Sequence, residues 1–371
     1  MYMEELLQLV FDRDGSDLHI SGGVPPIIRI NGKLVRTDYD PLTPEDTQRL
    51  VFSILSNEQR KTLEQTMELD CSYGVVGLGR FRVNAFRSKG AYAAVLRTIT
   101  SKIPRFEDLG LPPLIRELTH KPRGLILVTG PTGSGKSTTL AAMIDNINSS
   151  RAEHILTIED PIEFLHSPKM SLVNQRELGA DTKSFDNALR AALREDPDVI
   201  LVGELRDLET IRLAMTAAET GHLVFGTLHT SSAMQTVDRI VDVFPPHQQQ
   251  QIRVQISNGL VAVLSQTLVP KVGESGKGGR GRVMALEIMI NTPAVANLVR
   301  EGKTAQIYSA IQTGQKFGMQ TLENALKDLY FNRLISYEDA ISKTSRPDDL
   351  IRMIGAAPTS SMTQSMAQPL R

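Results

Sequence analysis

The sequence predicts a two-part α/β protein, in which a small α+β domain precedes a larger domain built on a parallel sheet. The chain has 371 residues, which is more than one ordinary core accommodates. Short helical and strand patterns alternate up to about residue 100. From Gly124 onward, apolar runs alternate with helical segments, namely "LILVTG", "HILTIED", "DVILVGE" and "HLVFGTLH". Such runs are typical of parallel strands that are covered on both faces.

The bulk composition is that of an ordinary globular protein. Hydrophobic residues make up 41% and charged residues 22% of the chain, and 42 acidic side chains nearly balance 41 basic ones. This balance gives no field that attracts nucleic acid, so we expect no nucleic-acid partner. The single cysteine, Cys71, excludes an internal disulfide and a zinc site built from cysteines.

Neither a signal peptide nor a membrane span is expected. The N-terminus "MYMEELLQLVFDRDGSD" is acidic and has no small-residue cleavage site. No window approaches the ~20 apolar residues that cross a bilayer. We therefore expect a soluble cytoplasmic protein with no direct membrane insertion.

The N-terminal domain is predicted at 1–99. "MEELLQLVFDRDG" has helical spacing, and "PPIIRINGKLVR" predicts a hairpin around an Asn-Gly turn. A helix is predicted to begin with Thr43 as its N-cap and Pro44 at its first position. "GRFRVNAFRSKG" and "AYAAVLRTI" predict an antiparallel pair.

The segment "TSKIPRFEDLGLPP" interrupts these patterns with three prolines, so an inter-domain linker is predicted at 100–121. The second domain is predicted at 122–355, with a mainly helical pattern after about residue 230. "GESGKGGRGR" is expected to be a flexible loop. The end of the chain, 356–371, is rich in Ser, Thr, Gln and Pro and is expected to be a disordered tail.

A phosphate-binding loop is the strongest motif in the chain. "GPTGSGKS", Gly130 to Ser137, follows an apolar strand and opens the helix "STTLAAMIDNI". Its glycines allow backbone N–H groups and the helix N-terminus to face the phosphates of ATP. Lys136 would bridge the β- and γ-phosphates, and Ser137 would hold Mg²⁺. The predicted nucleotide-binding residues are Gly130, Pro131, Thr132, Gly133, Ser134, Gly135, Lys136, Ser137 and Thr138.

Two further strand ends carry carboxylates. Ligands bind beyond the carboxyl ends of parallel strands, so Glu204 at the end of "DVILVGE" is placed to activate the attacking water. The alternative is a helix cap or an ion-pair partner. Gly203 precedes it where many P-loop ATPases have a Mg²⁺-binding Asp, so the metal is expected on Ser137 and water. The segment "LTIEDPIE" carries three acids, Glu159, Asp160 and Glu163. We expect them to serve catalysis or to order Mg²⁺; the alternative is an ordinary solvated loop.

A histidine follows a strand in "TGHLVFGTLHTSSA". At the carboxyl end of that strand, His229 can donate a hydrogen bond to the γ-phosphate and report its loss. The alternative is an ordinary surface or core histidine. His222 lies at the other end of the same strand, about seven residues away at ~3.3 Å each, so it is expected to be structural or at a subunit face.

The order of these motifs resembles the Walker A, Asp box, Walker B and His box of the secretion ATPase superfamily, the ring motors of type II and type IV secretion and of type IV pili. The resemblance covers about residues 1–355. It implies an N-terminal PAS-like domain joined to a RecA-like ATPase domain with a helical C-terminal part, assembled as a homo-hexamer.

Within that superfamily the chain most resembles the type IV pilus retraction ATPases, in "GSDLHISGGVPPIIRINGKL" and "EGKTAQIYSAIQTGQKFGMQTLENAL". The region "VPKVGESGKGGRGRVMALEIMI" lacks the four-cysteine element of most assembly ATPases. The family motif at Ala294 to Glu301 departs from the pattern, because Ala296 replaces an arginine. The resemblance implies docking to an inner-membrane platform protein at the inner face of the cytoplasmic membrane, with a paralogous motor subunit as a possible partner. The alternatives are a pilus-assembly or secretion ATPase, an accessory paralogue, a DNA-handling RecA-like ATPase, and a nucleotide-dependent scaffold without turnover.

The resemblance also implies that arginines of the N-terminal domain reach the nucleotide. The matching segments "GRFRVN" and "VLRTI" supply Arg82 and Arg97, with Arg80 behind them. Arg80 and Arg82 lie on one face of a strand because side chains repeat every two residues. An arginine that completes a phosphate site can be worth about 10³ to 10⁵ in rate. The alternative is a solvated basic strand face.

Overall fold

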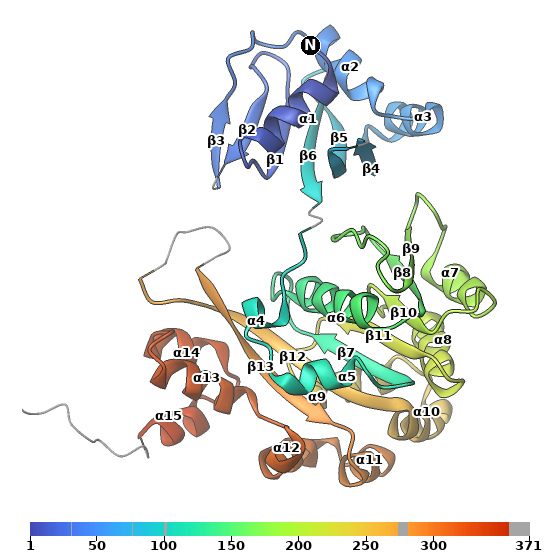
Figure 1. The fold of residues 1–371 in the computed structure, drawn as a ribbon, viewed down its shortest axis with the longest axis vertical. Helices are drawn as coiled ribbons and strands as arrows, with labels where there is room; N and C mark the ends of the chain where they lie inside the picture. Colours follow the sequence, from blue (N-terminus) through green and yellow to red (C-terminus); the bar gives the residue numbers. More distant parts are fainter. Residues whose placement is uncertain (31, 76, 100–101, 274–280, 356–371) are drawn as a thin grey trace, which may run out of the picture.

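The computed structural model describes residues 1–355 except 31, 76, 100–101 and 274–280, and it contains two sheets, each with its own helices (Figure 1). The predicted tail at 356–371 and most of the predicted glycine-rich loop lie outside the described residues. Among the residues described, no helix combines the length and the apolar character needed to span a bilayer.

The N-terminal part is a sheet of antiparallel strands in the order β3-β2-β1-β6-β5-β4. The predicted helix start is confirmed, because the Thr43 hydroxyl accepts the Asp46 N–H and Pro44 is the first helical residue. The predicted hairpin and antiparallel pair are confirmed as β2–β3 and β5–β6. The elements are α1 (Met3–Asp12), β1 (Asp17–Ile20), β2 (Ile27–Ile30), β3 (Lys33–Arg36), α2 (Pro44–Ser53), α3 (Asn57–Thr66), β4 (Glu68–Val75), β5 (Gly79–Ser88) and β6 (Ala91–Ile99).

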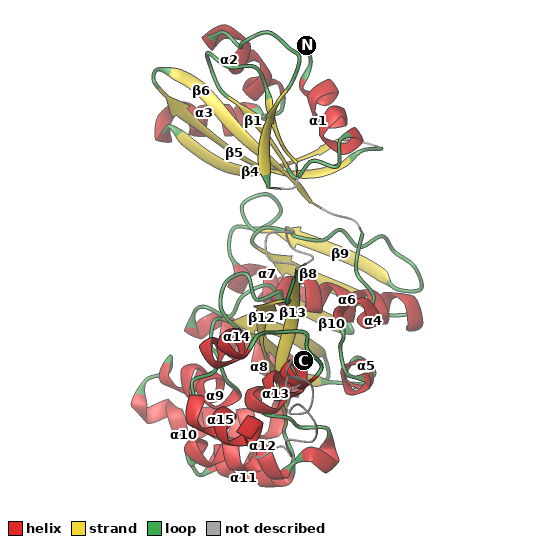
Figure 2. Ribbon diagram, turned by 90° about the vertical axis from the view of Figure 1, so that its left-hand side faces the viewer, coloured by secondary structure: helices red, strands yellow, loops and turns green. Residues whose placement is uncertain are grey.

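The helices α1, α2 and α3 contribute to a single core on one face of this sheet (Figure 2). In β5, the alternate residues Phe81, Val83 and Ala85 are buried in that core. Because strand side chains alternate between faces, Arg80 and Arg82 lie on the opposite face, which carries none of the helices described for this part.

The second sheet has the strand order β13-β12-β7-β11-β10-β8-β9. The apolar runs predicted as parallel strands are confirmed as β7, β8, β10 and β11, which pair in parallel. The strands are β7 (Gly124–Thr129), β8 (His154–Glu159), β9 (Leu172–Glu177), β10 (Val199–Val202), β11 (Leu223–Leu228), β12 (Leu260–Pro270) and β13 (Arg282–Ile290).

The chain after about residue 230 is mainly helical, as expected, but β12 and β13 are strands that the sequence analysis did not predict. These strands form an antiparallel pair, and β12 continues the sheet beside β7. An apolar run such as "LVAVLSQTLVP" has no period that distinguishes a buried strand from a buried helix. Its pairing with β7 and β13 is decided by contacts between distant parts of the chain.

Helices cover both faces of the second sheet and extend beyond its β13 edge (Figure 1). In β7, Leu125 and Leu127 face the core of α7–α10, whereas Ile126 and Val128 face that of α6. The same α6 core includes Phe106, from the predicted linker range. The helices are α4 (Phe106–Leu109), α5 (Pro113–Leu118), α6 (Lys136–Ser150), α7 (Phe185–Ala192), α8 (Leu208–Glu219), α9 (Ala233–Asp242), α10 (Pro246–Gly259), α11 (Pro293–Arg300), α12 (Ile307–Thr313), α13 (Leu322–Phe331), α14 (Tyr337–Lys343) and α15 (Pro347–Gly355), with short 3₁₀ turns at Thr304–Gln306 and Gln315–Phe317.

Candidate nucleotide site

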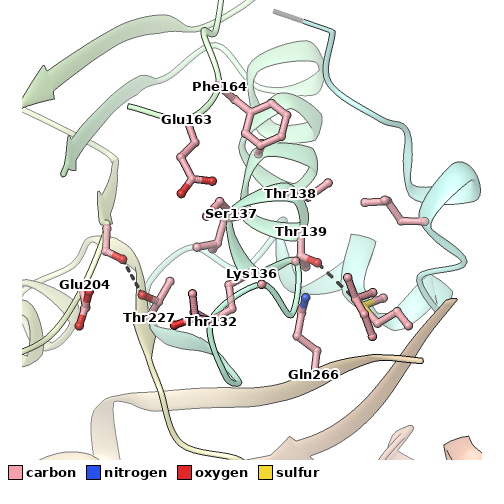
Figure 3. A pocket seen from close by; sticks show the side chains of 18 of the residues that line it. Thr132, Lys136, Ser137, Thr138, Thr139, Glu163, Phe164, Glu204, Thr227 and Gln266 are labelled. Atoms are coloured by element: carbon pink, nitrogen blue, oxygen red, sulfur yellow. Dashed lines mark hydrogen bonds between the residues drawn. The ribbon is translucent and has the colours of Figure 1, made fainter. Parts of the chain in front are cut away.

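A cavity of about 900 Å³ lies at the carboxyl edge of the second sheet, where β7, β8, β10 and β11 end. The phosphate loop after β7 forms one wall, and the segments after β8, β10 and β11 form another (Figure 3). Arg282 and Met284 of β13 and Glu107–Gly110 around α4 also line it. This is the place where open α/β sheets bind their ligands.

The phosphate loop has the backbone that its glycines were predicted to allow. Gly130, Gly133 and Gly135 have φ values of 143°, 77° and 89°, which a residue with a Cβ rarely adopts. A Cβ on Gly130 would lie 2.2 Å from the carbonyl oxygen of Gln266. The loop is therefore pressed against β12, and only glycine fits at this position.

Lys136, the first residue of α6, turns its amino group back over the loop. Its Nζ donates to the carbonyl oxygens of Gly130 and Pro131, at 2.8 and 3.2 Å. Burial lowers its pKa, while the carboxylates of Glu204 and Glu163 oppose that shift. Six of the predicted nucleotide-binding residues line the cavity: Thr132, Gly133, Gly135, Lys136, Ser137 and Thr138.

Two side chains that were each predicted to lie near the phosphates are in contact with each other. Glu204 follows β10 and His229 follows the neighbouring β11, and Oε1 of Glu204 lies 3.2 Å from Nε2 of His229. Oε2 of the same carboxylate lies 2.7 Å from a guanidinium nitrogen of Arg206. Burial raises the pKa of Glu204, but the hydrogen bonds and charges of Arg206 and His229 outweigh it and lower the pKa below its ordinary value.

The acidic segment after β8 enters the same cavity. Glu159 accepts from Oγ1 of Thr157 at 2.7 Å and from Nε2 of Gln175 at 3.2 Å, and burial raises its pKa to about 7. Glu163 is exposed, and its carboxylate points toward the start of α6, where Ser137 lies (Figure 3). Asp160 lies 4.0 Å from Arg206.

The predicted arginines lie outside the cavity of their own chain. Arg82 and Arg97 are exposed and directly opposite each other on β5 and β6. Arg97 pairs with Asp17 at 2.8 Å, and Arg80 lies 3.5 Å from Glu177, at the end of β9. None of the three arginines is among the residues that line the cavity.

His222 also lies away from the cavity, at the opposite end of β11. Its Nδ1 lies 2.9 Å from the carbonyl oxygen of Ala217, at the end of α8. This is consistent with the structural alternative predicted for it.

Comparison with known proteins identifies the family. The family model described as "Type II/IV secretion system protein" matches residues 57–328, which is more than half of the chain. The chain belongs to this family. It is accordingly an ATP-hydrolysing enzyme that binds nucleotide.

Members of the type II/IV secretion system family resemble the chain over nearly its whole length. It is 54% identical to the "Type IV pilus retractation ATPase PilT" of Pseudomonas aeruginosa over 94% of this chain and 100% of that protein. It is 40% identical to the "Type IV pilus ATPase PilU" of the same species, over 99% of this chain and 96% of that one. The chain also aligns with a crystal structure of the pilus retraction motor PilT with bound ADP, with a TM-score of 0.88 and 51% sequence identity. The alignment covers 95% of this chain and 100% of the PilT chain.

Two site residues were missed by sequence reasoning. Arg206 holds Glu204, and its position in "GELRD", just after the predicted base, was an available signal. Gln266 of β12 donates from Nε2 to the carbonyl oxygen of Ser134 in the phosphate loop, at 2.8 Å. An amide within an otherwise apolar strand was its only signal, and the partner could not be read from the sequence.

Proposed function

We propose that the chain is the subunit of a homo-hexameric motor that uses ATP hydrolysis to retract type IV pili. The observation that carries this proposal is 54% identity to a retraction ATPase over the full length of that relative. The contact between Glu204 and His229 at the end of the nucleotide cavity supports a hydrolytic engine. We place the motor at the cytoplasmic face of the inner membrane, docked to the platform protein of the pilus machine.

The chain's own residues account for each step of hydrolysis. Lys136 exchanges its two carbonyl partners for the β- and γ-phosphates, and the amides at the start of α6 hold the phosphate oxygens. Glu204, kept ionised by Arg206, accepts the proton of the attacking water. His229 contacts the γ-phosphate and returns to Glu204 when phosphate leaves.

Mg²⁺ fits the oxygen donors present at the cavity. The hydroxyl of Ser137 and the carboxylate of Glu163 both line it. Ser137 would hold the ion, with Glu163 ordering its water shell. When bound, Mg²⁺ neutralises charge that develops on the phosphate oxygens.

Arg82 and Arg97 are proposed to complete the site of a neighbouring subunit. Both are exposed on the face of the N-terminal sheet that carries no helix of its own, and neither lines the cavity of its own chain. An arginine supplied between subunits would make hydrolysis depend on the ring, as an arginine finger does.

The test is the substitution Glu204→Gln at the native locus of the source organism. Gln keeps the size of the side chain but cannot accept the proton, so we expect ATP binding without turnover, many pili and no surface movement. Pili are counted by electron microscopy, and phosphate release is measured on the purified protein. Glu219→Gln is the matched control, because Glu219 lies at the end of α8 outside the cavity.

Two other motor roles are separable by the same experiment. Bald cells would assign the chain to pilus assembly and overturn retraction while leaving the ATPase intact. The 40% identity to a PilU protein over 99% of the chain favours an accessory motor as the second candidate. In that case the Glu204→Gln cells would still retract pili through a paralogous motor, at reduced force.

A further inference from the structure

Glu287 of β13 is a buried carboxylate outside the nucleotide cavity. Only 4% of the residue is exposed. Its Oε1 accepts the N–H of Ala233, the first residue of α9, at 2.7 Å. A side chain of β13 therefore holds the start of α9, a helix that is distant from it in sequence.

The helices α9 and α13 belong to different parts of the domain. The start of α9 directly follows the loop that carries His229. The start of α13 is already fixed to β13 by backbone bonds between Gln320 and Ile288, at 2.9 and 3.2 Å. The side chain of Glu287 therefore connects α9 to β13, and β13 is in turn bonded to the residue that precedes α13 by two positions.

The opposite strand connects the same position to the phosphate loop. Ser265 of β12 is the register partner of Glu287. Its hydroxyl lies 2.8 Å from that of Thr129, the residue immediately before Gly130. Glu287 is therefore connected, through its partner Ser265 on β12, to the end of β7, the strand that leads into the phosphate loop.

A carboxylate suits this place for a physical reason. The first N–H groups of a helix have no partner within the helix and carry partial positive charge. A side-chain oxygen of Glu287 accepts from the N–H of Ala233 and satisfies this donor at the start of α9. At the start of α9, Ser232 accepts the N–H of Gln235, which leaves the N–H of Ala233 to Glu287.

We propose that Glu287 is a positioning residue that ties the start of α9, and with it the His229 loop, to the C-terminal helices that begin at Leu322. A displacement of His229 on loss of the γ-phosphate is then transmitted through the buried side chain of Glu287 to β13, and through the bridge between Ile288 and Gln320 to α13. This inference rests on the role proposed above for His229.

The same region offers a matched control. Glu323, in the first turn of α13, is also buried and accepts from the hydroxyls of Tyr308 and Thr344, at 3.0 and 2.6 Å. Those partners lie on α12 and after α14, so Glu323 holds the C-terminal helices together without a hydrogen bond to α9. Glu323→Gln therefore tests general destabilisation of this region.

The experiment compares full-length wild type, Glu287→Gln and Glu323→Gln by steady-state kinetics and by hydrogen exchange with and without ADP. For Glu287→Gln we expect the KM for ATP to change less than about twofold, kcat to fall about ten- to hundredfold, and the amide of Ala233 to exchange faster. ADP should alter exchange at the start of α13 in wild type and not in this variant. Glu323→Gln should lower the melting temperature while kcat stays within about twofold of wild type.

Three outcomes would overturn the inference. One is unchanged exchange at Ala233 in Glu287→Gln, and another is an equal loss of kcat in Glu323→Gln. The third is a response of α13 to ADP that survives in Glu287→Gln. Glu287→Met, which removes every acceptor, should accelerate exchange at Ala233 further than Gln does. If His229→Ala hydrolyses ATP normally, the proposed role of His229 is wrong. Hydrogen exchange at Ala233 still tests whether Glu287 holds the start of α9.

Discussion

Nε2 of His229 lies 3.2 Å from Oε1 of Glu204, across the ends of the neighbouring strands β11 and β10. The other oxygen of Glu204 lies 2.7 Å from Arg206. The residue proposed as the base thus has a partner on each oxygen, a guanidinium on one and an imidazole on the other. The residues proposed for proton transfer and for phosphate sensing are therefore in direct contact.

Arg206→Gln is expected to raise the pH at which hydrolysis begins. Arg206 is the main group that lowers the pKa of Glu204, so its loss raises that pKa and leaves less carboxylate at low pH. The acid limb of the kcat/KM profile should therefore move to higher pH, while the rate near pH 8 falls less. The check is ATPase activity from about pH 5 to about pH 8. An unmoved acid limb would show that Arg206 does not set the charge of the base.

Gly130→Ala is expected to abolish nucleotide binding. Its Cβ would lie 2.2 Å from the carbonyl oxygen of Gln266 and 2.6 Å from Oγ of Ser134, so the loop must shift. Gly133→Ala is the matched control, since Gly133 has a positive φ of 77° but no neighbour within 4 Å of an added Cβ. Calorimetric titration with ADP should show no binding for the first and weakened binding for the second. Equal affinities would mean that the contact with β12 does not shape the loop.

Glu177 is expected to stabilise the contact between the N-terminal sheet and the segment after β8. It is buried, its Oε2 accepts the N–H of Ile162 at 3.1 Å, and it lies 3.5 Å from Arg80. Glu177→Leu leaves that N–H without an acceptor, which costs about 1–3 kcal/mol of unfolding free energy. Glu177→Gln keeps an acceptor and should lose less. Urea unfolding of both variants measures the difference, and equal losses would assign the effect to the ion pair with Arg80.

Glu287 is expected to make folding stability depend on pH. Burial and the neighbouring Glu323 raise its pKa to about 7, against the opposing hydrogen bond from Ala233 and the charge of Arg346. Because the folded state holds the proton more tightly than the unfolded state, the stabilisation is full below the ordinary value of 4.5 and is lost as the pH rises through about 7.

Relative to Glu287→Gln, the wild type should lose up to about 3 kcal/mol of unfolding free energy between about pH 5 and about pH 8. The comparison removes the contribution of the other carboxylates, which titrate in both proteins. Urea unfolding at several pH values measures it. Parallel pH curves for the two proteins would show that Glu287 has an ordinary pKa.

Local sequence determined the parts of the site that depend on a single segment. The phosphate loop requires glycines at fixed spacing between a strand and a helix, so "GPTGSGKS" predicted Lys136 and Ser137 at the cavity. Glu204 and His229 were predicted because each follows an apolar run. The carboxyl ends of parallel strands share one edge, so both could be expected near the phosphates.

Only the tertiary structure decided the contacts that join distant segments. The pairing of β12 with β7 brings Gln266 to the phosphate loop, and the pairing of β13 with β12 brings Glu287 to α9. Neither pairing follows from residue type, because an apolar run does not specify its neighbours. Arg82 and Arg97 illustrate the same limit: their strand face was predictable, but which cavity that face meets depends on how domains and subunits are arranged. Hydrogen bonds and ion pairs between distant residues form only when the chain has folded. They are encoded by the sequence but cannot be read from it directly.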